Sequence, residues 1–188
     1  MKNSRHTLLL LICGFILAAA LSRLLPHPPN FTPVIAIALF AGAYFRGSKW
    51  AWMLPISVMI VSDIGLWWLH GYEFFTLMRL VIYLCLMAIV GIGIPVGTKI
   101  NIHRVVGGSL AGTVLFFIVT NFAVWLGGRL YPMTWEGLLA CYIAAIPFFR
   151  NTLLSALFYS AVMFGAIEFA KAWWQLPDRA ILSSRNIE

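Results

Sequence analysis

The chain is a series of long apolar stretches separated by short polar turns. A helix needs about 20 predominantly apolar residues to cross a bilayer, and most of the stretches approach that length. Six of them are predicted to be transmembrane helices, at residues 7–25, 32–45, 50–69, 74–96, 105–126 and 152–170. The pattern therefore predicts an all-α, polytopic integral membrane protein with one transmembrane domain, in which residues 171–188 form a short tail.

The second stretch is shorter than an ordinary span. Residues 32–45 cover only about 20 Å at ~1.5 Å per residue. We therefore expect this helix to tilt toward a thin part of the membrane, or to be completed by extended chain from the proline-rich turn at residues 26–30.

The last apolar stretch, residues 138–170, is too long for one span and too short for two. Irregular backbone is tolerated at membrane depth where protein or a water-filled cavity covers it. We expect such a break at Arg150-Asn151, which divides the stretch into a half-helix, residues 138–149, and the sixth span. A break there would line a pocket.

Composition excludes an ordinary soluble domain. The chain is 62% hydrophobic and 10% charged, and its mean hydropathy is +0.91. In a soluble domain this composition would leave large apolar patches in contact with water. The formal net charge of +7 comes from basic residues that lie in ones and twos between apolar stretches, which indicates membrane topology rather than nucleic-acid binding.

The basic residues predict the orientation of the chain. With the N-terminus in the cytoplasm, nine of them face inward: Lys2, Arg5, Arg46, Lys49, Lys99, Arg104, Lys171, Arg179 and Arg185. Arg23 and Arg129 then lie in or beside outer loops. Cytoplasmic loops are enriched in lysine and arginine, so we expect both termini in the cytoplasm.

Ionisable side chains inside the spans are candidates for function. Asp63 lies six residues before the outer end of the third span and Arg79 five residues after the outer start of the fourth, which puts both about 8–9 Å below the outer surface. We expect them to form an ion pair, which is equally compatible with a structural role and with ligand binding. Near the inner surface, Glu168 is expected to snorkel or to pair with Lys171 or Arg46.

Polar and aromatic side chains gather at the outer end of the predicted bundle. This one-sided polarity favours a pocket that opens outward over a through-pore, which would need polar lining at every depth. The candidate substrate-binding residues are His27, Asn30, Phe31, Asp63, Tyr72, Arg79, Asn121, Tyr131, Trp135, Arg150 and Asn151. The alternative for the aromatic members is a belt at the level of the lipid headgroups.

The three cysteines and the small residues suggest packing. Cys13, Cys85 and Cys141 lie in apolar stretches without C-x-x-C spacing, so we expect no metal site. Gly14, Ala18 and Ser22 form a small-residue stripe in the first span, and Ala38 with Gly42 repeats it in the second. Such stripes let helix backbones approach closely, either within the protein or, at the first span, against another membrane protein.

Motifs along nearly the whole chain resemble those of a family of small, uncharacterised bacterial membrane proteins. They are Asn30-Phe31-Thr32-Pro33-Val34 followed by Ala38-Leu39-Phe40 and Gly42-Ala43, then Ser62-Asp63, Thr120-Asn121-Phe122 with Val124-Trp125, Tyr131-Pro132 with Thr134, and the run CYIAAIPFFRNTL from Cys141 to Leu153. That family is in turn similar to the S components of energy-coupling factor vitamin transporters.

The resemblance to S components implies six helices, cytoplasmic termini in a bacterial inner membrane and a binding site roofed by the outer loops. It also implies that the stripe on the first helix docks a membrane coupling protein that works with ATPase subunits. The solitary cobalamin-binding type is the most similar, and in it a cysteine thiolate meets the cobalt. The second outer loop here, residues 71–76, has no cysteine, which leaves Cys141 as the one replacement.

These observations predict a non-enzymatic membrane protein that captures a vitamin-like small molecule from the outer face, with no cofactor of its own. The chain has no G-x-x-x-x-G-K-[ST] motif, so ATP hydrolysis by that route would belong to a partner. It also lacks G-x-S-x-G and H-E-x-x-H, which argues against an intramembrane hydrolase. The alternative is a non-enzymatic scaffold or assembly protein of the cell envelope.

Overall fold

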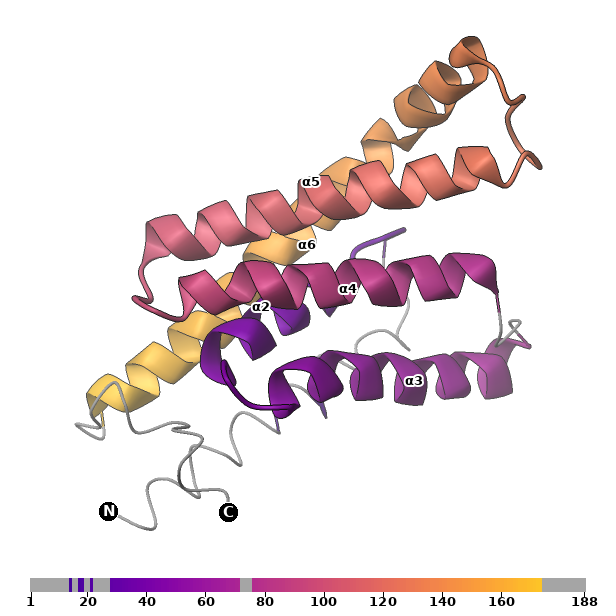
Figure 1. The fold of residues 1–188 in the computed structure, drawn as a ribbon. Helices are drawn as coiled ribbons and strands as arrows, with labels where there is room; N and C mark the ends of the chain where they lie inside the picture. Colours follow the sequence, from indigo (N-terminus) through magenta and orange to yellow (C-terminus); the bar gives the residue numbers. More distant parts are fainter. Residues whose placement is uncertain (1–13, 15–16, 19–20, 22–27, 72–75, 174–188) are drawn as a thin grey trace.

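The computed structural model describes residues 14, 17–18, 21, 28–71 and 76–173 and is helical wherever it is regular (Figure 1). Its elements are α2 (Val34–Tyr44), α3 (Trp50–His70), α4 (Leu77–Val96), α5 (Ile102–Leu126) and α6 (Trp135–Trp173). Four of them, α3 to α6, are long and apolar enough to cross a membrane. The predicted all-α class is confirmed, and the chain has the build of a multi-pass membrane protein.

The helices start where local sequence caps them. The Thr76 side chain accepts a hydrogen bond from the backbone N–H of Arg79, which begins α4. The Asn101 side chain does the same for Arg104 at 3.0 Å, so α5 begins three residues earlier than expected. Such caps satisfy backbone donors that the first turn of a helix leaves unpaired.

The predicted first span lies almost entirely outside the described residues. Gly14, Leu17, Ala18 and Leu21 are described, and all four are helical. The predicted total of six spans therefore stays a prediction. The four connected helices from α3 to α6 run alternately up and down, so the connections lie at two ends of the bundle. We call these the α3–α4 end, which also holds the α5–α6 connection, and the α4–α5 end.

The predicted break at Arg150-Asn151 is wrong, because α6 runs without interruption for 39 residues through both the half-helix and the sixth span. Arg150 lies exposed on its surface, and the Asn151 amide donates to the carbonyl of Pro29 at 3.0 Å. Both side chains are therefore accommodated without a break in the helix. A helix of this length measures about 58 Å, well over the ~30 Å hydrocarbon core, and Figure 1 shows it crossing the other helices obliquely.

The short helix α2 forms the centre of the molecule. All 11 of its residues are buried, and it packs against α3, α4, α5 and α6. A helix that is apolar on every face must be enclosed by its neighbours. The core consists of α2 side chains such as Ile35 and Phe40 together with Ile89 of α4 and Ile167 of α6.

The backbones of α2 and α4 touch through glycines. Gly93 of α4 and Gly97, the residue directly after α4, lie against the carbonyl groups of Leu39 and Ala43, and Gly42 lies against the carbonyl of Val90. A β-carbon at any of these three glycines would collide with those backbone atoms. The close approach expected at Gly42 is confirmed and belongs to internal packing. Its partner is a G-x-x-x-G motif at the end of α4.

We predict that Gly93→Ala and Gly97→Ala each lower the free energy of unfolding by about 1–3 kcal/mol, because backbone atoms cannot move aside as side chains can. Denaturant unfolding in mixed micelles measures the loss. Gly91→Ala is the matched control, since a β-carbon there meets no atom within 4 Å. An equal loss for Gly91→Ala would contradict the glycine contact as the cause.

A second prediction concerns orientation. Ser48 follows α2 at the α4–α5 end and Met133 precedes α6 at the α3–α4 end. In a background without the native cysteines, an impermeant thiol reagent should label Met133→Cys in intact cells and Ser48→Cys after lysis, because the basic residues favour a cytoplasmic α4–α5 end. The opposite labelling pattern would invert the orientation.

Candidate functional site

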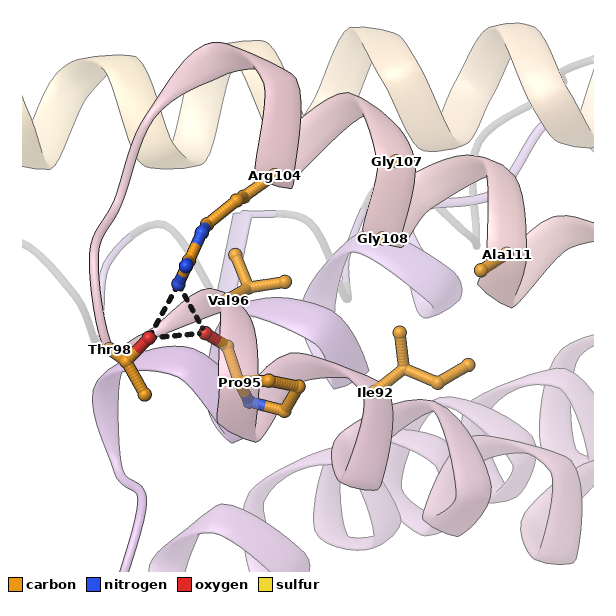
Figure 2. A pocket seen from close by; sticks show the side chains of 8 residues that line it. All are labelled: Ile92, Pro95, Val96, Thr98, Arg104, Gly107, Gly108 and Ala111. Atoms are coloured by element: carbon orange, nitrogen blue, oxygen red, sulfur yellow. Dashed lines mark hydrogen bonds between the residues drawn. The ribbon is translucent and has the colours of Figure 1, made fainter.

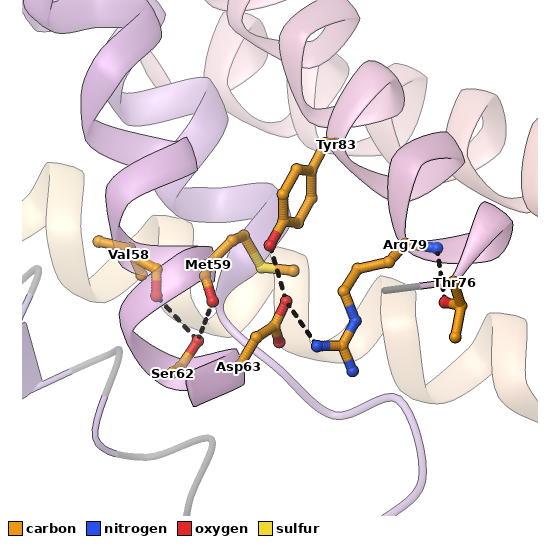
Figure 3. A network of polar contacts seen from close by, with 7 residues as sticks. All are labelled: Val58, Met59, Ser62, Asp63, Thr76, Arg79 and Tyr83. Atoms are coloured by element: carbon orange, nitrogen blue, oxygen red, sulfur yellow. Dashed lines mark hydrogen bonds and ion pairs between the residues drawn. The ribbon is translucent and has the colours of Figure 1, made fainter. Parts of the chain in front are cut away.

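A buried carboxylate lies between α3 and α4 near the α3–α4 end (Figure 3). The side chain of Asp63 is 3% exposed, and its Oδ2 atom lies 3.6 Å from Nη1 of Arg79. The hydroxyl of Tyr83 donates a hydrogen bond of 2.9 Å to the same oxygen. The predicted ion pair is confirmed, and Tyr83 is an additional member of what we call the Asp63 cluster: Asp63, Arg79 and Tyr83.

The connection between α3 and α4 brings these side chains to one level. Gly71 ends α3 with φ at 67°, a left-handed conformation that glycine adopts freely, and Thr76 caps the start of α4. Arg79 and Tyr83 are four residues apart and therefore share a face of α4. That spacing is the sequence signal by which Tyr83 could have been found.

The cluster is costly to bury and stable only as a unit. An isolated carboxylate in apolar surroundings carries a desolvation penalty of several kcal/mol, which a hydrogen-bonded partner of opposite charge offsets. The neighbouring Ser62 is also buried, but its hydroxyl bonds to the carbonyls of Val58 and Met59 in its own helix. Asp63 holds α3 to α4 here.

A second group of contacts holds the chain that precedes α2. Residues 28–33 are not in a helix, and Asn30 has a positive φ of 61°. Asn151 binds the carbonyl of Pro29, while the ring of Phe31 lies 6.3 Å from that of Phe158 and 6.0 Å from that of Tyr159 (centroid distances). This segment is thus packed against the middle of α6.

This non-helical segment lies inside the thickness of the bundle. Ala43 contacts Gly97, at the end of α4. From that level α4 extends back about 30 Å, whereas α2 extends back only about 14 Å, to Val34. Val34 therefore lies about halfway along the length of α4, and the non-helical chain joins α2 at that level. Such backbone is tolerated at membrane depth where protein covers it or where it lines a cavity.

The other candidate residues lie elsewhere. Asn121 donates to the carbonyl of Phe117 in its own helix and accepts from the thiol of Cys141 at 3.5 Å, so both sit in the α5–α6 contact. Trp135 is 81% exposed, Tyr131 is partly exposed in the α5–α6 connection, and Arg150 is exposed. His27 and Tyr72 lie outside the described residues. A binding role for all of these stays a prediction.

The docking stripe of the first span is described in part. Gly14 and Ala18 are exposed, and a β-carbon at Gly14 would meet no atom within 4 Å. Ser22 lies outside the described residues. The role of the stripe in partner binding stays a prediction.

At the opposite end a second charged group fixes α2 to α6. The hydroxyl of Tyr44 donates to Oε1 of Glu168 at 2.7 Å, and Nζ of Lys171 lies 2.6 Å from the same atom. The ammonium group is also 5.1 Å from the centre of the Tyr44 ring. The expected pairing of Glu168 with Lys171 is confirmed.

Two cavities lie toward the α4–α5 end. One, of about 450 Å³, is a groove between α4 and α5 (Figure 2). The other, of about 330 Å³, lies between the start of α5 and the second half of α6 and includes Ser109 and Ser160, whose hydroxyls are 3.0 Å apart. Neither contains a residue of the predicted substrate site. Within the described residues, no three metal-binding side chains form a group.

The Asp63 cluster generates a third prediction. Asp63→Asn or Arg79→Gln alone should destabilise the protein more than the double substitution, because each single change leaves a buried charge without its partner. We expect a coupling energy of about 1–3 kcal/mol from a double-mutant cycle of unfolding free energies in detergent. Arg129→Gln, in the exposed α5–α6 connection, is the control. Additive losses would mean that the two residues are not coupled.

Comparison with known proteins places the chain in a family but finds no characterised relative. No curated protein and no solved structure matches it. The model of a family of unknown function (DUF6580) matches residues 2–178, which include every described helix and the whole Asp63 cluster. The chain therefore belongs to this family of unknown function, DUF6580.

Proposed function

We propose that the protein is a membrane substrate-binding protein that captures a vitamin-like small molecule from the outer face, in the manner of an S component. The observation that carries this proposal is the Asp63 carboxylate, which is buried between helices that are long and apolar enough to cross a membrane. Ionisable residues in such positions are costly and mark ligand or ion sites.

The position of the first loop supports the same interpretation. Residues 28–33 lie against the middle of α6 without forming a helix, and the ring of Phe31 packs there against the rings of Phe158 and Tyr159. Small-molecule sites combine apolar and aromatic walls with a few fixed polar groups. In this proposal the aromatic wall holds the apolar body of the ligand, and the Asp63 cluster binds its polar groups.

The available chemistry narrows the ligand class. Asp63 and Arg79 present a carboxylate and a guanidinium close together, so the ligand carries groups that both donate and accept hydrogen bonds. The thiol of Cys141 is buried and bonded to the carbonyl of Asn121. We therefore favour a ligand held by hydrogen bonds over one held by a bond from cysteine to cobalt.

Uptake in this proposal requires a partner. The small-residue stripe of the first span is the proposed docking face for a membrane coupling protein that works with ATPase subunits, and the exposure of Gly14 and Ala18 is compatible with this. Cytoplasmic termini in a bacterial inner membrane complete the proposed topology.

Native mass spectrometry of gently purified protein tests the proposal. The wild type should retain a bound small molecule, and the Asp63→Asn/Arg79→Gln double variant should bind it roughly 10–100-fold more weakly, since it lacks two charged hydrogen-bonding groups. Arg129→Gln should keep the ligand. Retention of the same mass by a folded double variant would contradict a role of the cluster in binding and favour a scaffold.

A further inference from the structure

The groove between α4 and α5 has an apolar floor and a cation at one end (Figure 2). Ile92 and Val96 of α4 form one wall, and Gly107, Gly108 and Ala111 of α5 form the other. The groove holds about 450 Å³ and is open along its length. It lies at the end of the bundle away from the Asp63 cluster, so it is independent of the proposed solute site.

Arg104 closes the groove at the α4–α5 end. Its Nη1 atom donates to the carbonyl of Pro95 at 3.1 Å and to the hydroxyl of Thr98 at 2.5 Å. Both side-chain hydrogen bonds that Arg104 makes with described residues use Nη1. A guanidinium has five N–H donors in a planar fork, so the remaining donors of this held side chain suit a phosphate group.

The charge around Arg104 favours an anion. Five of the eight described lysines and arginines lie at this end: Arg46, Lys49, Lys99, Arg104 and Lys171. The described carboxylate at the same end, Glu168, is already paired with Lys171. Basic pockets between transmembrane helices, at the level of the headgroups, are typical binding sites for anionic lipids.

The small residues of the α5 wall leave room for an acyl chain. Arg104, Gly107 and Ala111 are three to four residues apart and so follow one face of the helix. A β-carbon at Gly107 would meet no atom within 4 Å, which means that the groove is open space at that point. A cation at the headgroup level with an apolar channel leading away from it matches the build of one phospholipid.

We infer that this groove binds one molecule of an anionic glycerophospholipid, with its phosphate on Arg104 and one acyl chain along Gly107 and Ala111. The phosphate receives charge-assisted hydrogen bonds from the guanidinium. The acyl chain covers the apolar walls. A zwitterionic lipid with the same acyl chains offers the same apolar contact but carries a positive group that this basic end disfavours.

Lipid titration of the full-length protein, followed by native mass spectrometry in detergent, tests this inference. Phosphatidylglycerol should bind roughly tenfold more tightly than phosphatidylcholine with identical acyl chains, because both phosphates are anionic but the choline cation would lie next to the Arg104 guanidinium and be repelled by it. Arg104→Gln should remove this preference. Lys99→Gln, an exposed cation at the same end outside the groove, should retain it.

A second variant separates lipid binding from the structural bonds of Arg104. A β-carbon at Gly107 would meet no atom within 4 Å, so the side chain introduced by Gly107→Leu can extend into the open groove. This variant should weaken the binding of both lipids while leaving the unfolding temperature unchanged. Unchanged lipid binding in Gly107→Leu, or equal affinity of the wild type for the two lipids, would overturn the inference. Displacement of phosphatidylglycerol by an equal concentration of glycerol 3-phosphate would also overturn it, because it would identify a site for a free phosphate.

Discussion

The contact between the backbones of α2 and α4 is the constraint on which the rest of the structure depends. Two apolar helices in lipid gain little by hiding apolar surface from each other, so close packing must hold them together. Gly42, Gly93 and Gly97 permit this packing because a β-carbon at any of them would collide with the opposite backbone. With α2 held this tightly, α3, α5 and α6 enclose it and bury all 11 of its residues.

The shortness of this central helix determines where a site can form. The Tyr44 hydroxyl bonds to Glu168 at the α4–α5 end, so α2 ends there, and its 11 residues cover about half the length of α4. The chain at residues 28–33 precedes α2 as a non-helical segment with a turn, in which the N–H of Phe31 donates to the carbonyl of Pro28. Asn151 satisfies one of its carbonyl groups from α6. Irregular backbone and the Asp63 cluster therefore both belong to the half of the bundle that α2 does not fill.

Features that depend on local sequence could be predicted, and features that depend on distant neighbours could not. Asp63 and Arg79 were paired correctly because two helices joined by a short turn place equal counts of residues at equal depth. The break at Arg150-Asn151 was wrong because the partner of Asn151 is a carbonyl 122 residues away in the sequence. Gly93 and Gly97 stand in an apolar stretch that does not reveal which helix will face them.

The polar side chains form hydrogen bonds either within their own helix or between helices. Residues of the second kind are the better candidates for a specific role. Thr113, Thr120 and Thr152 bond to carbonyls four residues earlier in their own helices, which makes them tolerable in lipid but specifies nothing about neighbouring helices. Bonds between helices do specify the fold. The Glu168 group makes one of these bonds, from Tyr44 of α2, and it lies at the α4–α5 end of the bundle. Asp63 lies between α3 and α4, with its side chain 3% exposed. A buried charge there costs stability that an apolar pair of similar volume would not, which is why the proposed binding site is placed at Asp63 rather than at Glu168.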